Sequence, residues 1–241
     1  MPVVLENLGK RFGDGAPVLD GVNASIGRGE FVALLGASGC GKSTLLNIIA
    51  GLEAPTSGAL EVPSDGAAFM FQDAALFPWL TARENVELAL KLRGVGKAER
   101  RAQANGLLDL VHLGGAGDKR PHELSGGMRQ RVALARSLAQ DRQLLLMDEP
   151  FAALDAITRD LLHDELERIW KETGRTIVFV THNVREAVRL GQRVLLLSSR
   201  PGRVVQEWRV SEDHRTDAGL AGHLTGVITA RLREEIRRHA K

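Results

Sequence analysis

The chain has 241 residues, of which 44% are apolar and 26% are charged, and 32 Lys and Arg stand against 30 Asp and Glu. This composition is typical of a globular protein with a sizeable core, and the near balance of charge argues against a broad nucleic-acid-binding surface. No apolar run approaches the length of a membrane-spanning helix, and a single cysteine, Cys40, excludes an internal disulfide and a cysteine-based zinc site. These features favour a cytoplasmic protein.

A glycine-rich loop between a strand and a helix is the strongest pattern in the first part of the chain. Weak alternation predicts strands over residues 3–12 and 18–26, and the apolar run 31–35 predicts a buried strand. Residues 36–43 then read Gly-Ala-Ser-Gly-Cys-Gly-Lys-Ser, and residues 44–50 predict a helix. The spacing GxxxxGKS between a strand and a helix is the P-loop pattern, which binds nucleotide phosphates.

The residue types in this loop suit ATP with Mg²⁺. Glycines let successive backbone N–H groups point into one concavity, and the helix N-terminus adds a partial positive charge. Lys42 can reach the β- and γ-phosphates, and the Ser43 hydroxyl is a hard oxygen ligand for Mg²⁺. The expected nucleotide-binding residues here are Gly36, Ser38, Gly39, Cys40, Gly41, Lys42, Ser43 and Thr44.

The middle of the chain is predicted to be largely helical. A short apolar strand over residues 67–71 ends at Gln72. Residues 83–138 then read as mostly helical, with breaks at Gly94, 114–117 and Pro121. This helical block separates the P-loop from the next buried strand.

A second apolar strand ends in two acids. Residues 144–149 read Leu-Leu-Leu-Met-Asp-Glu. Enzymes with a P-loop use a carboxylate at such a strand end to hold Mg²⁺ opposite the loop Ser or Thr, which predicts a metal role for Asp148. Glu149, one residue further, is predicted to orient or deprotonate the attacking water. An ordinary strand end with solvated acids is the alternative, and the P-loop weighs against it.

The last third of the chain alternates helix and strand. Runs 177–180 and 194–197 predict two more buried strands, and buried strands that alternate with helices predict a parallel sheet in an α/β fold. The helix between the strands predicted at 144–147 and 177–180 is expected to bury one face. That face consists of Ile157, Leu161, Leu162, Leu166, Ile169 and Trp170.

An amphipathic helix is predicted for the tail from Ala218 to Lys241. Its apolar residues recur every four positions, and its end is basic. The basic residues form either a solvated face or a membrane-surface contact. The apolar set is Leu220, Leu224, Ile228, Leu232 and Ile236, and the basic set is Arg231, Arg233, Arg237 and Arg238.

A third motif opens the last helix of the helical block. Residues 124–131 read Leu-Ser-Gly-Gly-Met-Arg-Gln-Arg. Ser125 is a predicted N-cap, while Gly126 and Gly127 leave backbone N–H groups bare, which makes a second candidate anion site. A capped surface helix would be the reading of this segment alone.

Together these segments resemble the ATP-binding-cassette (ABC) ATPases over residues 3 to about 205. Residues 124–131 resemble the signature motif of that family, and the order of P-loop, Gln72, signature, Asp148-Glu149 and His182 matches it. The resemblance implies an α/β fold: a P-loop NTPase (RecA-like) core with a mostly parallel sheet, an antiparallel β edge and an inserted α-helical subdomain. The expected ranges are 1–82 and 139–210 for the ATP-binding core, 83–138 for the helical subdomain, and 211–241 for a helical tail.

The resemblance also implies roles for single residues. Catalysis is expected from Glu149, His182 and Gln72, and the metal is expected on Ser43, Gln72 and Asp148. Phe12 occupies the place where an aromatic ring usually stacks on adenine, and the chain has no tyrosine to replace it. Asp155 is expected at a dimer seam. Ser125, Gly126 and Gly127 are expected to contact the γ-phosphate of a nucleotide held by the other protomer, so a homodimer makes two composite sites.

Four segments resemble the ATPase subunits of the nitrate, sulfonate and taurine importer group: FQDAALFPWLTARENV (71–86), DEPFAALDAITRD (148–160), WKETG (170–174) and LLLSSRPGRVV (195–205). The resemblance implies a peripheral protein on the cytoplasmic face of the cell membrane. Its partners would be a transmembrane permease and, indirectly, a substrate-binding protein, with no nucleic acid. The expected substrate is taurine or another alkanesulfonate, or nitrate. A soluble ABC ATPase, such as an iron–sulfur assembly ATPase, is the alternative.

The loop after Gln72 is the expected permease contact. Leu76, Phe77, Trp79 and Leu80 surround a proline there, which suggests an apolar docking groove. Local core packing under a loop is the other interpretation of these side chains.

Overall fold

The computed structural model describes residues 3–239, so residues 1–2 and 240–241 of the expected core and tail lie outside the described residues. The described strands are β1 (Val3–Lys10), β2 (Leu19–Ile26), β3 (Phe31–Gly36), β4 (Ser57–Glu61), β5 (Ala67–Met70), β6 (Leu144–Asp148), β7 (Thr176–Val180), β8 (Arg193–Leu197) and β9 (Val204–Arg209). The helices are α1 (Lys42–Ile49), α2 (Ala82–Leu92), α3 (Lys97–Leu110), α4 (Gly126–Ala139), α5 (Ala156–Thr173), α6 (Val184–Leu190), α7 (Glu212–Thr216) and α8 (Ala218–His239), with 3-10 turns at Gly114–Ala116 and Pro121–Glu123.

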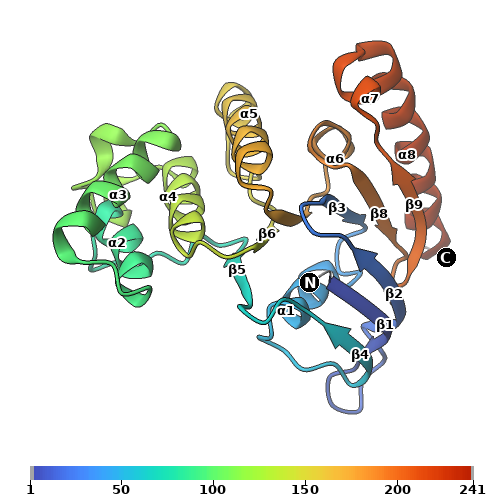
Figure 1. Ribbon diagram of the computed structural model, residues 1–241. Coiled ribbons are helices and arrows are strands. Elements are labelled where there is room, and N and C mark those ends of the chain that lie inside the picture. The colour runs from blue at the N-terminus through green and yellow to red at the C-terminus, as the bar shows by residue number, and fades with distance from the viewer. Residues whose placement is uncertain (1–2, 240–241) are drawn as a thin grey trace.

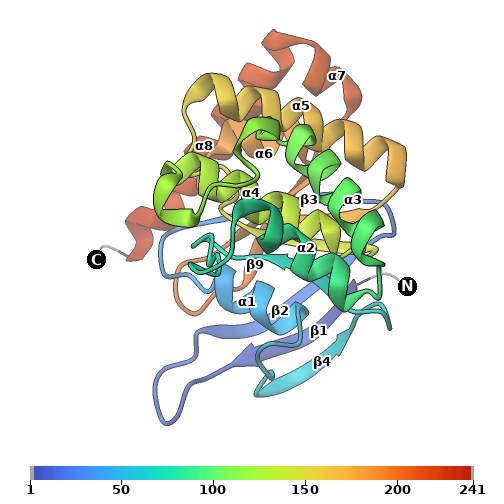
Figure 2. The ribbon, with the colours of Figure 1, turned by 90° about the vertical axis from the view of Figure 1, so that its left-hand side faces the viewer.

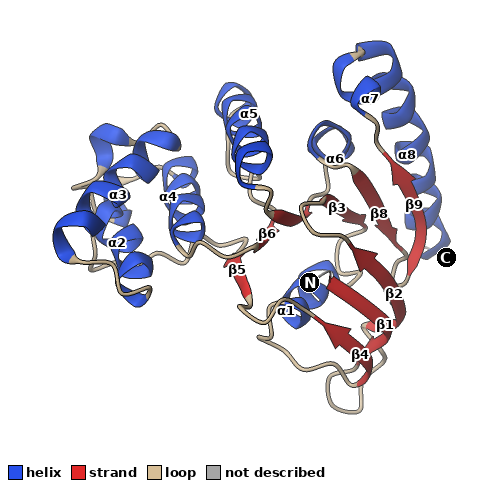
Figure 3. Cartoon of the chain, viewed as in Figure 1, coloured by secondary structure: helices blue, strands red, loops and turns tan. Residues whose placement is uncertain are grey.

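The strands form two sheets (Figure 3). The larger has the order β5-β6-β7-β3-β8-β9, parallel throughout except for the antiparallel edge strand β9. The smaller is antiparallel, in the order β2-β1-β4. The predicted fold class, an α/β P-loop core with a mostly parallel sheet and an antiparallel edge, is confirmed.

Both faces of the larger sheet are covered, which is why its central strands consist of apolar runs. All six residues of β3 are buried. Phe31, Ala33 and Leu35 pack into one core cluster with α5, α6 and α8, while Val32 and Leu34 pack with α1 and the smaller sheet. The alternation of β3 side chains between the two clusters therefore fixes the P-loop at the carboxyl end of a rigid central strand.

Helices α2, α3 and α4 form a separate group beside the sheet (Figures 1 and 2). A capping box starts α2, because Thr81 accepts a hydrogen bond from the Glu84 N–H and the Glu84 carboxylate accepts one from the Thr81 N–H. The helix-bounded segment from 82 to 139 is one residue longer at each end than the expected subdomain, 83–138, and the division into domains stays a prediction.

The expected buried face of α5 was wrong at two of its six residues, Ile157 and Leu161. Leu162, Leu166, Ile169 and Trp170 are buried, but Ile157 is 76% exposed and Leu161 is 47% exposed. At 3.6 residues per turn, a residue nine positions away lies on the opposite side of the helix, so Ile157 and Leu166 cannot share a face.

The same drift limits the apolar face of α8. Leu224 and Ile228 are buried and Leu232 packs partly against the core, whereas Leu220 and Ile236 are about half exposed. Residues four positions apart are rotated slightly past one full turn of the helix. Over the five apolar residues from Leu220 to Ile236 this rotation adds up, so the first and the last of them turn away from the core. At the basic end, Arg231 and Arg238 contact the buried Glu235 carboxylate at 2.6 and 3.1 Å.

Candidate functional site

The P-loop connects β3 to α1 in a conformation that requires glycine. Gly41 is the N-cap of α1 with φ 101°, and a Cβ there would lie 2.7 Å from the Leu19 side chain. No side chain caps α1, so its first N–H groups are available to an anion. The Lys42 ammonium is buried and donates to the Gly36 and Ala37 carbonyl oxygens at 2.9 Å each.

Sequence-distant residues that were predicted to act together meet around this loop. A cavity of about 580 Å³ is lined by Gln72, Glu149 and His182 across from the P-loop residues. The P-loop contributes Gly36, Ser38, Gly39, Gly41, Lys42, Ser43 and Thr44 to the lining, and Val18 and Arg200 complete it.

Cys40 differs from its P-loop neighbours because its thiol turns into the core. The residue is 1% exposed, and its Sγ lies where a Cβ on Gly36 would be. Burial raises the pKa of the thiol, against a smaller opposing effect of Lys42. Any part that Cys40 has in phosphate binding falls to its main chain.

Glu149 stands at the centre of the polar side of the cavity. Its Oε2 lies 3.2 Å from His182 Nδ1 and 3.5 Å from Gln72 Nε2. Its backbone has φ 47°, a left-handed conformation rare outside glycine, and its N–H donates to the Val180 carbonyl. Such strain is kept where surrounding structure enforces it, and it gathers at active sites. The structure thus brings together the three residues predicted to be catalytic.

Asp148 ends β6 directly before Glu149 and is 6% exposed. Burial raises the pKa of its carboxyl, and a hydrogen bond with the Ser43 hydroxyl opposes that rise. A carboxylate, a hydroxyl and the amide oxygen of Gln72 are the hard donors that Mg²⁺ prefers. Residues 3–239 contain no group of three His, Cys, Asp or Glu placed to hold a metal ion.

His182 is exposed, but hydrogen bonds hold the residues on either side of it in the chain. On one side, the Thr181 hydroxyl donates to the buried Glu186 carboxylate at 2.6 Å. On the other, Asn183 caps α6 by accepting from the Arg185 N–H, and its amide donates to Glu186 at 3.3 Å. The Asn183 side chain thus serves both as the N-cap of α6 and as a donor to Glu186.

The signature segment forms a second cluster outside the P-loop cavity. Ser125 caps α4 by accepting from the Met128 N–H at 3.2 Å. A Cβ on Gly127 would lie 3.2 Å from the Ala153 carbonyl oxygen, so glycine permits close packing on the segment before Asp155. Asp155 in turn caps α5 by accepting a hydrogen bond from the Thr158 N–H. This hydrogen bond lowers the pKa of the Asp155 carboxyl.

Phe12 also lies outside the cavity lining. Its ring is 51% exposed in the loop after β1, and the Lys10 ammonium lies 4.7 Å from the ring centroid. An exposed ring with one charged neighbour can accept a stacking partner, and its adenine contact stays a prediction.

The loop after Gln72 presents two aromatic rings to the surface. Trp79 is 67% exposed and Phe77 is 38% exposed, with ring centroids 5.5 Å apart. Beneath them, the fully buried Asn85 accepts from the Phe77 N–H and donates to the Leu80 and Phe77 carbonyls. Leu76 instead packs against the core, as the alternative interpretation of the loop had it.

Val18 and Arg200 were missed by the sequence analysis. Arg200 follows β8, the neighbour of β3, at the carboxyl end of the sheet where α/β folds bind ligands. That position could have identified it. Val18 carries no such signal, because a valine before a strand is ordinary.

No helix within residues 3–239 is long and apolar enough to cross a membrane.

Comparisons with known proteins agree with this geometry. The family model described as "ABC transporter" matches residues 19–152. A taurine import ATP-binding protein, TauB, of Jannaschia sp. (strain CCS1) is 42% identical over 97% of this chain and 92% of that protein. TauB of Burkholderia pseudomallei (strain K96243) is 50% identical over 78% of this chain and 75% of that protein. An uncharacterised ABC transporter ATP-binding protein of Methanocaldococcus jannaschii is 46% identical over 88% of this chain and 84% of that protein.

A solved structure shares the fold as well. The ATP-binding cassette MJ0796, in a dimeric post-hydrolysis state bound to ADP and Pi, superposes with a TM-score of 0.79 at 36% identity. The superposition covers 87% of this chain and 99% of that chain. Fold, motifs and relatives agree, and the chain belongs to the ABC transporter family.

Proposed function

We propose that this chain is the ATP-hydrolysing subunit of an ABC importer for taurine or a closely related alkanesulfonate. The chain is an ATPase of its family, and the convergence of Glu149, His182 and Gln72 on the P-loop cavity carries the proposal for its active site. The substrate rests on the taurine import proteins to which the chain is similar. The iron–sulfur assembly alternative is not favoured, and nitrate stays the second candidate substrate.

The chain's residues divide the chemistry between them. The P-loop N–H groups and Lys42 bind the phosphates of ATP. Ser43, Asp148 and Gln72 would hold Mg²⁺, which when bound would neutralise charge on the phosphates. Glu149 accepts a proton from the attacking water, and His182, 3.2 Å from Glu149, contacts the γ-phosphate and keeps that carboxylate oriented.

A second copy of the chain completes each site in this proposal. Ser125, Gly126 and Gly127 lie outside the cavity of their own P-loop, with unpaired N–H groups at the start of α4. In a two-fold dimer they would contact the γ-phosphate on the partner's P-loop, with Asp155 at the seam. ATP would then hold the dimer together and hydrolysis would release it.

A permease is the proposed membrane partner. The exposed pair Phe77 and Trp79 offers an aromatic anchor for a loop helix of the permease. This contact would keep the chain on the cytoplasmic face of the membrane, where ATP is available. A separate binding protein would select the substrate, which never touches this chain.

Growth after deletion of the gene tests the substrate. Deletion should abolish growth on taurine as the sole sulfur source and leave growth on sulfate intact, and the wild-type gene should restore it. Loss of growth on nitrate as the nitrogen source, with normal growth on taurine, would replace taurine by nitrate. Normal growth in both media, together with impaired iron–sulfur enzymes, would favour the rejected alternative.

A further inference from the structure

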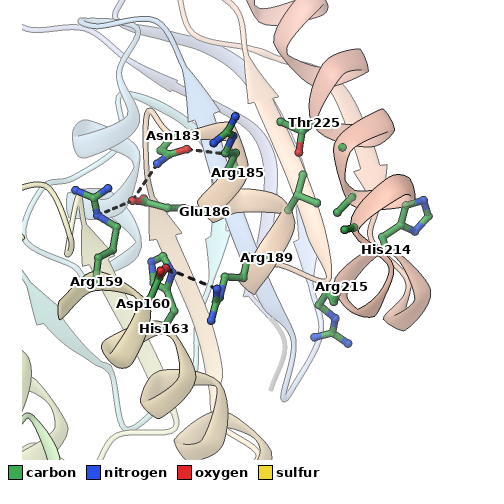
Figure 4. Close-up of a pocket in the computed structure, with 14 residues that line it drawn as sticks. Arg159, Asp160, His163, Asn183, Arg185, Glu186, Arg189, His214, Arg215 and Thr225 are labelled. Carbon is green, nitrogen blue, oxygen red and sulfur yellow. Dashed lines mark hydrogen bonds and ion pairs between the residues drawn. The ribbon is translucent and has the colours of Figure 1, made fainter. Parts of the chain in front are cut away.

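A cavity of about 610 Å³ lies apart from the P-loop, enclosed by α5, α6, α7 and α8 (Figure 4). It is as large as the nucleotide cavity, and neither the family motifs nor the proposed function uses it. Arginines from three of these helices line it: Arg159 on α5, Arg185 and Arg189 on α6, and Arg215 on α7. Asp160 and Glu186 are its acidic lining residues.

Unpartnered polar atoms concentrate in this cavity. In the described part of the chain, six buried side-chain nitrogen or oxygen atoms have no hydrogen-bond partner. Five of them belong to cavity residues: Nε of Arg159, both ring nitrogens of His163, and Nε and Nη1 of Arg215. Three of the five have a carboxylate only at longer range: Arg159 Nε lies 3.5 Å from Glu186, and His163 Nδ1 and Arg215 Nη1 lie 3.9 Å from Asp160 and Glu167. Buried polar groups without hydrogen-bond partners are rare in native proteins because each one costs free energy, so this concentration favours a missing partner.

His163 is the most deeply buried of these groups. It is 3% exposed, and its ring packs edge-on against Phe151 with centroids 4.5 Å apart. Burial lowers its pKa to about 4, with the positive charge of Arg189 adding to the effect. The neutral ring carries one donor and one acceptor, and both nitrogens lie buried in the wall of the cavity.

The charges of the cavity favour an anion. Four arginines line the cavity against two lining carboxylates, and two of these arginines are already paired: Arg159 lies 3.5 Å from Glu186, and Arg189 lies 3.7 Å from Asp160 and 2.5 Å from Asp164, which stands outside the lining. The charge left for an anion is therefore that of Arg185, which forms no ion pair with the described residues, and of Arg215. Arg215 stacks over Trp170 and reaches an acid, Glu167, only at 3.9 Å. Guanidinium groups from several directions suit an oxyanion that accepts hydrogen bonds on several oxygens.

A chain of contacts links the cavity to the catalytic residues. Arg159, Asn183 and Glu186 line it, and the same three residues line a smaller cavity of about 50 Å³ together with Glu149 and His182. Glu186 holds both Thr181 and Asn183, the neighbours of His182 on either side. A ligand that draws Arg159 away from Glu186 would therefore loosen the support of His182.

We infer that the cavity between α5, α6, α7 and α8 binds a small tetrahedral oxyanion, a sulfonate, sulfate or phosphate group, and that its occupation lowers ATP turnover through Arg159 and Glu186. The site is built from residues of this chain alone, and only the choice of the imported sulfonate as ligand rests on the proposed function. Its ligand would be either the imported sulfonate itself or a free inorganic oxyanion of the cell.

Calorimetric titration of the full chain tests the site. Taurine, sulfate and phosphate are titrated separately at constant ionic strength, with Mg²⁺ and a non-hydrolysable ATP analogue filling the P-loop, because ADP alone would leave the γ-phosphate position open to phosphate or sulfate. Saturable binding by taurine but not by the inorganic ions would identify the imported sulfonate as ligand, whereas binding of sulfate and phosphate would identify an inorganic oxyanion. No binding below a Kd of about 10 mM for any of them would show that the cavity holds only water, and would overturn the inference.

Two variants locate the binding. Arg215→Gln removes a charge and should raise Kd about tenfold or more. His163→Phe keeps the ring against Phe151 but removes both nitrogens, so it should weaken binding without lowering the melting temperature of the ligand-free chain. Arg233→Gln, an exposed arginine of α8 outside the cavity, is the matched control and should leave Kd unchanged. Equal effects of all three variants, or none from any, would place the binding elsewhere.

Turnover measured with and without the bound anion tests the link to catalysis. The anion should lower ATPase turnover about fivefold or more in the wild-type chain, a typical coupling between sites. Arg215→Gln should need about tenfold more anion for the same effect. Turnover that stays constant while calorimetry shows the cavity occupied would overturn the coupling through Glu186.

Discussion

Glu149 Oε2 lies 3.2 Å from His182 Nδ1, although the two residues follow different strands of the sheet, β6 and β7. Asp148 and Val180 are paired in register across β6 and β7, which places the residues after them side by side. The contact joins a residue that can deprotonate water to one that can contact the γ-phosphate.

Glu149→Gln should keep the shape of the site and remove the base. We expect ATP binding to persist, turnover to fall by at least about 10², and an ATP-bound dimer to accumulate on size-exclusion chromatography. His182→Ala should also slow turnover, because the carboxylate loses its nearest nitrogen partner. Turnover at the wild-type rate in Glu149→Gln would refute the assignment of the base.

Ser125 should act across the dimer. Ser125→Arg and Lys42→Ala chains are each expected to be inactive, but their mixture should form heterodimers with one intact composite site and one that carries both changes. Part of the activity should therefore return on mixing. Heterodimers demonstrated by differential tagging, with no activity above that of either variant, would rule out shared sites.

The buried Asp148 carboxylate should lower the free energy of unfolding at neutral pH, although hydrolysis requires it. Because burial raises the pKa of its carboxyl in the folded chain, the unfolded chain loses its proton first as pH rises, and the folded state is disfavoured above the unfolded pKa. Asp148→Asn should thus be more resistant to urea than wild type at pH 7 without ligand. The gain should vanish at acidic pH, where both states are protonated, and hydrolysis should be lost. An equal gain at both pH values would contradict this explanation.

Trp79 should matter to the membrane complex and not to hydrolysis by the isolated chain. The residue lies outside the P-loop cavity, and loss of an aromatic anchor can cost about 2 kcal/mol, or roughly 30-fold in affinity. Trp79→Ala should release the chain from membranes that contain the permease. Leu92→Ala, which changes an apolar residue 82% exposed elsewhere, is the control. Equal membrane retention of the two variants would remove the loop from the docking surface.

The strands next to the P-loop could be predicted because burial on both faces leaves continuous apolar runs, as in β3 and β6. Strand β9 could not, since most of its residues are at the exposed edge and show no alternation. Strand β4 gives no apolar run either, because most of its residues are exposed and Gly58 takes φ 81° beside the main chain of Asn7.

The site followed the same division. Residues in short motifs, such as Lys42 and Glu149, could be identified because their chemistry needs fixed local spacing. The arginine-lined cavity has no such pattern, since Arg159, Arg189 and Arg215 come from three helices and meet only through tertiary packing. The expected buried face of α5 was wrong at Ile157 and Leu161 for a different reason. Spacing along the chain does not by itself give the angle of a residue around the helix.

Uptake of radiolabelled taurine tests the central claim most directly. Cells that lack the gene receive either the wild-type chain or Glu149→Gln at equal expression. The account predicts that deletion abolishes ATP-dependent taurine uptake, that the wild-type chain restores it, and that Glu149→Gln does not. Taurine uptake that survives the deletion, or that Glu149→Gln restores in full, would contradict it.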